Sequence, residues 1–202
     1  MEHIPLFASN LFYSKIEDQN ILDEVDTLSK NERYREMPNS DIGEDLRVLE
    51  KIPSSKSYLM NICDNLFKNT LMYEPKFEIT TSWFTRTKTN HGSSLHNHRN
   101  CFYSAVFYFE DYEENTVGNI KFRSPISSFF NYDIVPTQWN IFNSHVWSIA
   151  PQKGLLLIFP SFVFHSITRH NTNNNRYSLA FNIVPVGEYG DSDSSYNSEW
   201  VS

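Results

Sequence analysis

The stretch FEITTSWFTRTKTN, residues 77–90, marks a change in the character of the chain. It alternates apolar and polar residues and is rich in threonine and aromatic side chains, which is typical of a half-buried β-strand. Apolar runs bounded by turn-forming residues follow at short intervals, at 103–111, 119–125, 145–151, 154–161 and 176–186. About six short strands without helices between them predict a β-sandwich or barrel.

The composition agrees with a β-rich core, since 16 Phe, 11 Tyr and 4 Trp stand among 202 residues. A chain of this length fits one domain. We predict three parts within it: a strand plus helical support over 1–75, a jelly-roll core over 76–186 and a polar tail over 187–202. The first part should hold a strand within 5–16, a helix after residue 17 and a second helix ending near Leu71. The tail is acidic and is expected to be disordered unless Trp200 anchors it.

Charge and cysteine content restrict the function. The net charge is -7 without a basic run, so a nucleic acid is not expected as the main partner. Cys63 and Cys101 form no CxxC motif and do not indicate a disulfide framework. The first residues lack a basic region before an apolar run, and no segment has about 18 consecutive apolar residues. We therefore expect a soluble cytoplasmic protein, in the host cytoplasm if a phage encodes it.

Three of the seven histidines lie within HGSSLHNH, residues 91–98. On a β-strand, His96 and His98 would share one face with their Cα atoms about 6.5–7 Å apart, close enough to hold one metal ion. A polar loop with chance clustering is the alternative. His165, far along the chain in GLLLIFPSFVFHS, could supply a third ligand at the end of an apolar strand. Three protein ligands leave positions for water and substrate, as in a catalytic metal site, and imidazole suits Fe(II), Zn(II), Cu and Ni alike.

Arg176 begins the predicted strand RYSLAFNIVPV, eleven residues after His165. A surface arginine on an edge strand is the simpler interpretation. If the side chain instead points into a barrel, its planar guanidinium could hold a carboxylate next to the metal.

Taken in order, the motifs H-x-H, an aromatic strand, G-x-L-x-I-F-P-S-x-x-x-H and R-x-S-x-x-F-N resemble the 2-oxoglutarate- and Fe(II)-dependent oxygenases. They are most similar to a little-characterised branch of bacteria and phages with an H-x-H-x-N signature. The resemblance covers about residues 77–184 and implies a mainly β fold, a double-stranded β-helix or jelly roll, with iron at its mouth. It also implies oxidative decarboxylation of 2-oxoglutarate to succinate, coupled to hydroxylation of a substrate.

The resemblance implies a role for each matching residue. His96 matches the first histidine of the family's His-x-Asp/Glu…His triad and His165 matches the distal one. Arg176 matches the residue that pairs with the far carboxylate of 2-oxoglutarate, with Ser178 as its companion. His98 departs from the pattern, because it stands where the family usually has a carboxylate.

The departure at His98 affects the charge of the site. Three neutral imidazoles leave Fe(II) at about +2, whereas a triad with one carboxylate lowers it to about +1, so an anionic cosubstrate should be favoured. His98 could instead lie outside the metal shell while water completes it, or the site could hold another metal. Two further hypotheses stay open: a three-histidine, cupin-like oxygenase that uses no 2-oxoglutarate, and a non-catalytic jelly-roll binding module.

Several other residues receive no catalytic role. Aromatic residues near the motifs are expected mainly to pack in the core; they are Trp83, Tyr103, Tyr108 and Phe181. The acidic residues of EDYEEN are expected in a solvated turn; they are Glu110, Asp111, Glu113 and Glu114. The remaining histidines are expected at the surface; they are His3, His91, His145 and His170.

The substrate is left open between a small molecule, a protein residue and a nucleobase, although the acidic charge disfavours the last, and a homodimer is compatible with the sequence. We expect the substrate pocket to be formed by loops, among them residues 37–51 and 127–144.

Overall fold

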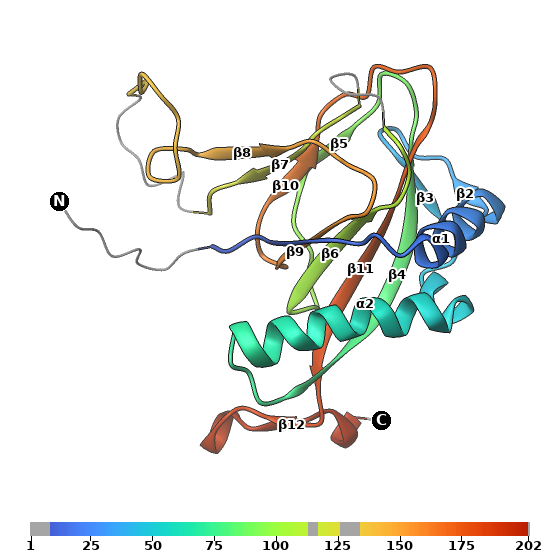
Figure 1. Ribbon diagram of the computed structural model, residues 1–202. Helices are drawn as coiled ribbons and strands as arrows, with labels where there is room; N and C mark the ends of the chain where they lie inside the picture. The colour runs from blue at the N-terminus through green and yellow to red at the C-terminus, as the bar shows by residue number, and fades with distance from the viewer. Residues whose placement is uncertain (1–8, 113–116, 126–133, 202) are drawn as a thin grey trace.

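Two antiparallel β-sheets form the centre of the molecule (Figure 1). The computed structural model describes residues 9–112, 117–125 and 134–201. The fold is mainly β with two helices at one side, so the predicted jelly roll is confirmed.

The larger sheet has seven strands and the smaller has four. In spatial order the larger sheet contains β1 (Phe12–Lys15), β9 (Leu155–Pro160), β6 (Tyr103–Tyr108), β11 (Arg176–Val186), β4 (Lys76–Thr87), β3 (Asp41–Gly43) and β2 (Tyr34–Arg35). The smaller sheet contains β5 (Ser93–His96), β10 (His165–Ile167), β7 (Ile120–Arg123) and β8 (Val146–Ile149). Three strands that precede residue 76 thus belong to the larger sheet.

The central strands β6 and β9 are buried on both faces, which explains their unbroken apolar sequence. Successive side chains point to opposite faces of a strand. Phe107 and Leu156 therefore belong to a cluster on the helical side of the larger sheet, whereas Val106 and Leu157 belong to a second cluster between the two sheets.

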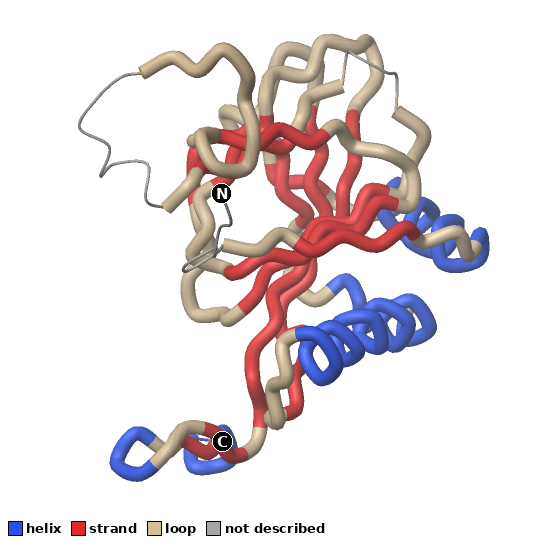
Figure 2. Tube along the Cα trace, turned by 60° about the vertical axis from the view of Figure 1, so that its left-hand side comes forward, coloured by secondary structure: helices blue, strands red, loops and turns tan. Residues whose placement is uncertain are grey.

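Two helices cover the outer face of the larger sheet (Figure 2). Helix α1 (Gln19–Asn31) begins after Asp18, whose side chain accepts a hydrogen bond from the backbone N–H of Asn20. Helix α2 (Pro53–Asn65) continues through a π-helical turn to Thr70, close to the predicted end at Leu71. Within the described part of the chain, no helix is long and apolar enough to cross a membrane.

All six strands predicted after residue 76 are present, and β1 lies within the strand predicted over 5–16, but the shortest strands were missed. β5 and β10 have four and three residues and carry too little periodicity to be recognised. The expectation of a disordered tail is wrong for residues 188–197, where β12 (Glu188–Tyr189) pairs with β13 (Tyr196–Asn197). The ring centroids of Tyr189 and Tyr196 lie 5.2 Å apart. Residues 1–8, which contain the start of the expected first strand, and the Trp200 side chain lie outside the described residues.

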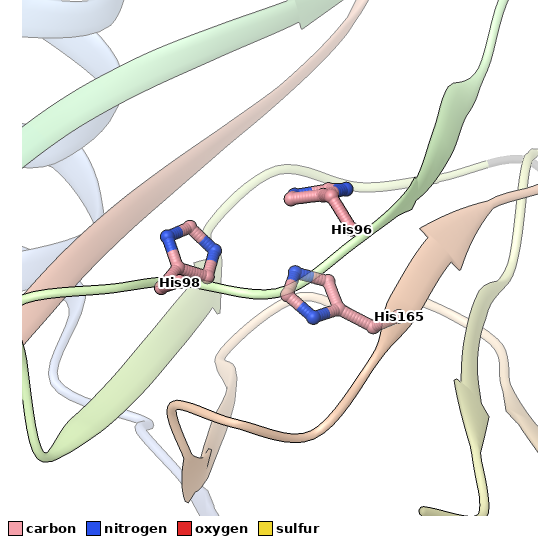
Figure 3. A group of neighbouring side chains, drawn as sticks. All are labelled: His96, His98 and His165. Atoms are coloured by element: carbon pink, nitrogen blue, oxygen red, sulfur yellow. The ribbon is translucent and has the colours of Figure 1, made fainter.

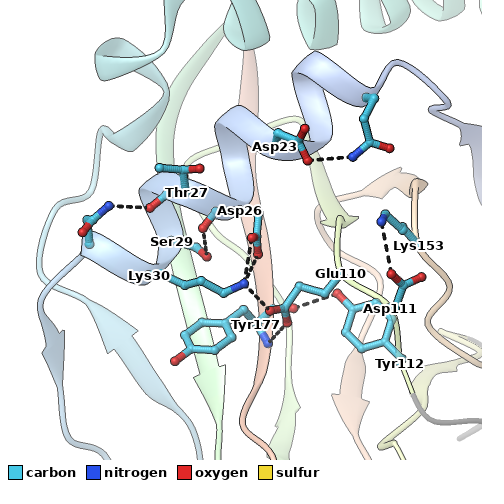
Figure 4. A network of polar contacts seen from close by, with 12 residues as sticks. Asp23, Asp26, Thr27, Ser29, Lys30, Glu110, Asp111, Tyr112, Lys153 and Tyr177 are labelled. Carbon is cyan, nitrogen blue, oxygen red and sulfur yellow. Dashed lines mark hydrogen bonds and ion pairs between the residues drawn. The ribbon is translucent and has the colours of Figure 1, made fainter.

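Glu110 links α1 to the larger sheet and does not lie in a solvated turn as predicted (Figure 4). Its carboxylate accepts a hydrogen bond from the backbone N–H of Tyr177 at 3.1 Å and lies 3.6 Å from Lys30 Nζ. Burial raises the pKa of Glu110. Asp111 is exposed and pairs with Lys153, as a turn residue would, whereas 113 and 114 lie outside the described residues.

Candidate active site

The histidines predicted as metal ligands meet where β5 and β10 pair in the smaller sheet. His96 and His165 are directly opposite each other in this pairing. His165 begins β10 and does not end the preceding strand, because β9 stops at Pro160 and the chain crosses to the other sheet over 161–164. The side chain of Ser161 fixes this crossing by donating to the carbonyl of Cys101 at 2.6 Å.

The prediction that His96 and His98 share a strand is wrong in its detail. His96 is the last residue of β5, and His98 lies two residues beyond it. The backbone N–H of His98 donates to the carbonyl of Ser161 at 3.0 Å, which holds this segment beside the crossing between the sheets. This contact keeps His98 close to the other two histidines without a strand.

The three imidazole rings face a common space (Figure 3). One nitrogen from each of His96, His98 and His165 lies within 4.8 Å of the other two. The ring centroids are 4.4 Å apart for His96 and His165, and 5.2 Å apart for His98 and His165. His96 is exposed, whereas His165 is buried, so the cluster extends from solvent into the fold.

Backbone carbonyls select the tautomer of two of these rings. His96 Nδ1 lies 2.8 Å from the carbonyl of Ser94, and His165 Nδ1 lies 3.1 Å from the carbonyl of Val163. A carbonyl only accepts, so Nδ1 carries the proton and Nε2 keeps a lone pair. This is the arrangement in which a histidine binds a metal through Nε2.

The environment also keeps two of the imidazoles neutral. Burial, together with the neighbouring His96, lowers the pKa of His165 to about 3 and that of His98 to about 4. Metal–nitrogen bonds are about 2.0–2.1 Å long, so a shared ion requires nitrogen atoms roughly 3–4 Å apart. Small side-chain rotations, easiest for the exposed His96, would bring the cluster to that spacing. The donor set therefore fits Fe(II).

Arg176 lies in the same cavity as the histidines and is only 2 % exposed, so the interpretation as a surface arginine is wrong. Its guanidinium donates to the carbonyl of Gly118 at 3.0 Å and to Thr87 Oγ1 at 3.3 Å. Among the described residues no carboxylate pairs with it, and its Nε has no hydrogen-bond partner. The nearby Tyr108 is also fully buried with an unpartnered hydroxyl, and its ring centroid lies 5.6 Å from Arg176 Cζ.

The register of β4 against β11 places a row of hydroxyl groups beside Arg176. Thr87 is opposite Arg176 and Thr85 is opposite Ser178, and the Thr85 and Ser178 hydroxyls are 2.7 Å apart. Both threonines line the cavity. The sequence analysis did not identify them, because nothing local distinguishes them from other strand threonines.

The cavity has a volume of about 480 Å³, within the range of roughly 300–1,000 Å³ for small-molecule sites. Part of the predicted loop 37–51 forms one wall, through Met37, Pro38, Asn39, Ser40, Ile42 and Leu46. None of the described residues 134–144 lines it, and 127–133 lie outside the described part of the chain. Part of the 37–51 segment thus lines this cavity, although its residues 41–43 form β3 and not a loop.

The remaining candidate residues divide between core and cavity. Tyr103, Tyr108 and Phe181 are buried in the core, as expected, whereas Trp83 lines the cavity with its ring 5.7 Å from that of His98. His170 is 2 % exposed and the expectation of a surface position is wrong, because its loop folds back and its backbone N–H donates to the carbonyl of His91. His91 and His145 are partly exposed, and residue 3 lies outside the described residues.

The fold resembles several solved structures at low sequence identity. A Pseudomonas putida prolyl-4-hydroxylase is 11% identical with a TM-score of 0.62, over 89% of this chain and 94% of that chain. HygX from Streptomyces hygroscopicus, solved with nickel and 2-oxoglutarate, is 11% identical with a TM-score of 0.62, over 88% and 83%. The epimerase SnoN from nogalamycin biosynthesis is 10% identical with a TM-score of 0.64, over 91% and 82%. At these identities the likeness shows the fold alone.

A jelly roll with three histidines and a buried arginine in one cavity fits a mononuclear metal enzyme. A family model described as "Putative 2OG-Fe(II) oxygenase" matches residues 81–182, just over half of the chain. The chain therefore belongs to the 2-oxoglutarate- and Fe(II)-dependent oxygenases, with iron as its metal and 2-oxoglutarate as its cosubstrate. No curated protein matches it in sequence. The assignment favours the oxygenase prediction over the cupin-like enzyme and the binding module.

Proposed function

We propose that this oxygenase is a hydroxylase whose iron is held by His96, His98 and His165. The observation that carries the proposal is the convergence of these three side chains with the buried Arg176 in one cavity. The overall reaction would consume 2-oxoglutarate, O2 and a substrate C–H bond, and would release succinate, CO2 and the hydroxylated product. When bound, iron and 2-oxoglutarate supply the oxidising chemistry, and the protein supplies position and exclusion of water.

His98 would act as a ligand in the position that usually carries a carboxylate. An imidazole there fills the third protein position, and so we do not propose the halogenation associated with relatives in which that position is vacant. Three neutral ligands also leave the positive charge of the metal unreduced. The site should therefore attract an anionic cosubstrate strongly.

Arg176 would bind the distal carboxylate of 2-oxoglutarate. Its buried guanidinium lacks an acidic partner among the described residues, and a buried charge is stable only when it is paired. Ser178 and Thr87 place hydroxyl groups on the same side of the cavity and could donate to the same carboxylate.

The proposal can be tested by metal and cosubstrate binding under anaerobic conditions. Wild-type protein should bind one Fe(II) and develop a visible charge-transfer band when 2-oxoglutarate is added. Alanine variants of the three histidines should each bind iron at least about tenfold more weakly, because each removes one of three ligands. His91→Ala is the matched control, since His91 lies near the cluster in sequence but outside it in space.

Conversion of 2-oxoglutarate to succinate without added substrate would then support oxidative turnover. Absence of the charge-transfer band in the wild type, or equal iron binding by His98→Ala and His91→Ala, would count against the proposed site.

A further inference from the structure

The charge of the cavity differs in sign from that of the whole protein. The chain carries a net charge of -7, yet the only charged side chains among the described cavity-lining residues are Arg35 and Arg176. No Asp, Glu or Lys occurs in that lining. The electrostatic potential inside a cleft with low-dielectric walls is set mainly by the charges that line the cleft. This cavity should therefore attract anions.

The two arginines lie at opposite depths. Arg176 is buried at the floor beside the hydroxyl row, whereas Arg35 is exposed at the end of β2. Arg35 makes no side-chain hydrogen bond or ion pair with any described residue, although Glu36 next to it pairs with Lys88. In the proposed function, the distal carboxylate of 2-oxoglutarate pairs with Arg176 and leaves Arg35 without an anionic partner. Arg35 thus remains available for a second anionic group.

Between Arg35 and the histidines the wall is apolar. Met37 and Leu46 are 41 % and 53 % exposed and line the cavity from the 35–46 segment. Trp83 faces them from β4 and reaches the histidine cluster, since its ring lies 5.7 Å from that of His98. A hydrocarbon group in this space would bury the exposed side chains and lie beside the metal ligands.

The 35–46 segment is held in place across the cavity mouth. Asn39 Nδ2 donates to Ser94 Oγ at 2.9 Å on β5, so the segment contacts the strand that carries His96. The carboxylate of Asp41, 2 % exposed, accepts from Arg86 at 2.8 Å and pairs with Lys88 at 3.1 Å. These contacts fix Arg35, Met37 and Leu46 relative to the site, which a specific substrate requires.

We infer that the substrate is an amphiphilic anion: a carboxylate- or phosphate-bearing molecule whose apolar group packs against Trp83, Met37 and Leu46 while Arg35 binds its anionic group. This inference rests on the proposed function, because it assigns the apolar group to the position next to the iron ligands. A cationic substrate of the same shape would meet Arg35 and the undiminished charge of the metal, and both would repel it.

Three probes with one hydrocarbon body and different charge test the inference: 4-phenylbutyrate, 4-phenylbutanol and 4-phenylbutylamine. Binding to the protein is measured by calorimetry, both without metal and with Mn(II) and 2-oxoglutarate. The butyrate should bind about three- to tenfold more tightly than the amine, the scale of an exposed ion pair. With Mn(II), relaxation of the phenyl protons should be enhanced, which places that end of the probe near the metal.

Two variants identify the groups responsible. Arg35→Gln should lower the butyrate-to-amine ratio, both with and without the metal, and leave butanol binding unchanged, whereas Arg33→Gln, an exposed arginine outside the cavity, should keep the ratio. The double variant Met37→Ser with Leu46→Ser should weaken the binding of all three probes severalfold, because it removes apolar contacts with their hydrocarbon body. Both side chains are exposed, so their replacement should leave the fold intact. Binding by none of the probes, equal binding of the butyrate and the amine, or an unchanged ratio in Arg35→Gln would overturn the inference.

Failure of the inference and failure of the proposed function give different results. If the charge-transfer band with Fe(II) and 2-oxoglutarate forms but the carboxylate preference is absent, only the inference is wrong. If the band does not form but metal-free protein shows an Arg35-dependent carboxylate preference, the anion site stands and the proposed iron site is wrong.

Discussion

Replacement of Arg176 by methionine should separate stability from cosubstrate binding. Methionine keeps the unbranched apolar stem of the side chain and removes its charge. In the absence of ligands, Arg176 is a buried cation whose described contacts are one carbonyl, that of Gly118, one hydroxyl, that of Thr87, and the Tyr108 ring. Burial of an incompletely paired ion costs several kcal/mol, and charged hydrogen bonds return about 1.5–3 kcal/mol each.

These terms nearly cancel, so we expect the free energy of unfolding of metal-free Arg176→Met to equal that of the wild type or to exceed it by up to about 2 kcal/mol. In a chain of this size, 1 kcal/mol corresponds to roughly 2–4 °C in Tm. Cosubstrate binding should respond in the opposite sense. Loss of a buried charge-assisted contact costs about 2–5 kcal/mol, which corresponds to about 30-fold to more than 1,000-fold in the Kd for 2-oxoglutarate.

Denaturant unfolding of the metal-free proteins and calorimetric titration of 2-oxoglutarate in the presence of Mn(II) measure the two effects. At a concentration of 100 times its Kd, 2-oxoglutarate should stabilise the wild type by about 2.7 kcal/mol, and at that same concentration it should add little to the variant. Arg33→Met is the control, because it removes an exposed arginine from outside the cavity. A loss of more than about 2 kcal/mol in the metal-free variant would indicate a structural arginine. A Kd for 2-oxoglutarate within threefold of the wild type would remove Arg176 from the cosubstrate site.

Three further predictions concern other parts of the site. His98→Asp should still bind one Fe(II), because a carboxylate also ligates iron, but it should bind 2-oxoglutarate more weakly since it lowers the charge of the metal; failure to bind iron in anaerobic titration would contradict this. Gly118→Ala should lower the free energy of unfolding by about 1–3 kcal/mol and weaken 2-oxoglutarate binding, because the added Cβ would lie only 2.2 Å from the carbonyl oxygen of Thr168 and displace the carbonyl that orients Arg176; unchanged urea unfolding would refute it. Asp41→Asn should destabilise the protein by about 1–3 kcal/mol at pH 7 and less below about pH 4. Burial alone would raise the pKa of Asp41, but hydrogen bonds from Arg86 and from Lys88 lower it, so the carboxylate stabilises the fold above the unfolded-state pKa and this stabilisation is lost as the pH falls through the folded-state pKa. A stability difference that does not change with pH in urea unfolding would contradict this prediction.

The local sequence was sufficient for the fold class and for the main candidate residues. Alternation over 77–90 and the apolar runs at 103–111 and 154–161 identified the long strands, because side-chain periodicity reports directly on which faces are buried. The family resemblance carried by the order of the histidine and arginine motifs predicted one site for His96, His98, His165 and Arg176, and the structure brings all four to one cavity.

Contacts between distant segments decided the rest. Thr85 and Thr87 join the cavity only because β4 pairs with β11 in one register, and His98 stays near His96 and His165 through a backbone contact with Ser161 and not through a strand. Arg35 reaches the cavity from a two-residue strand at the edge of the larger sheet.

Local sequence thus determined the long strands and the residue types of the candidate metal ligands, whereas the tertiary structure alone decided the charge and shape of the cavity. The physical reason is that a residue's propensity acts over its immediate neighbours, while register, burial and the partners of a charged group depend on segments tens of residues away.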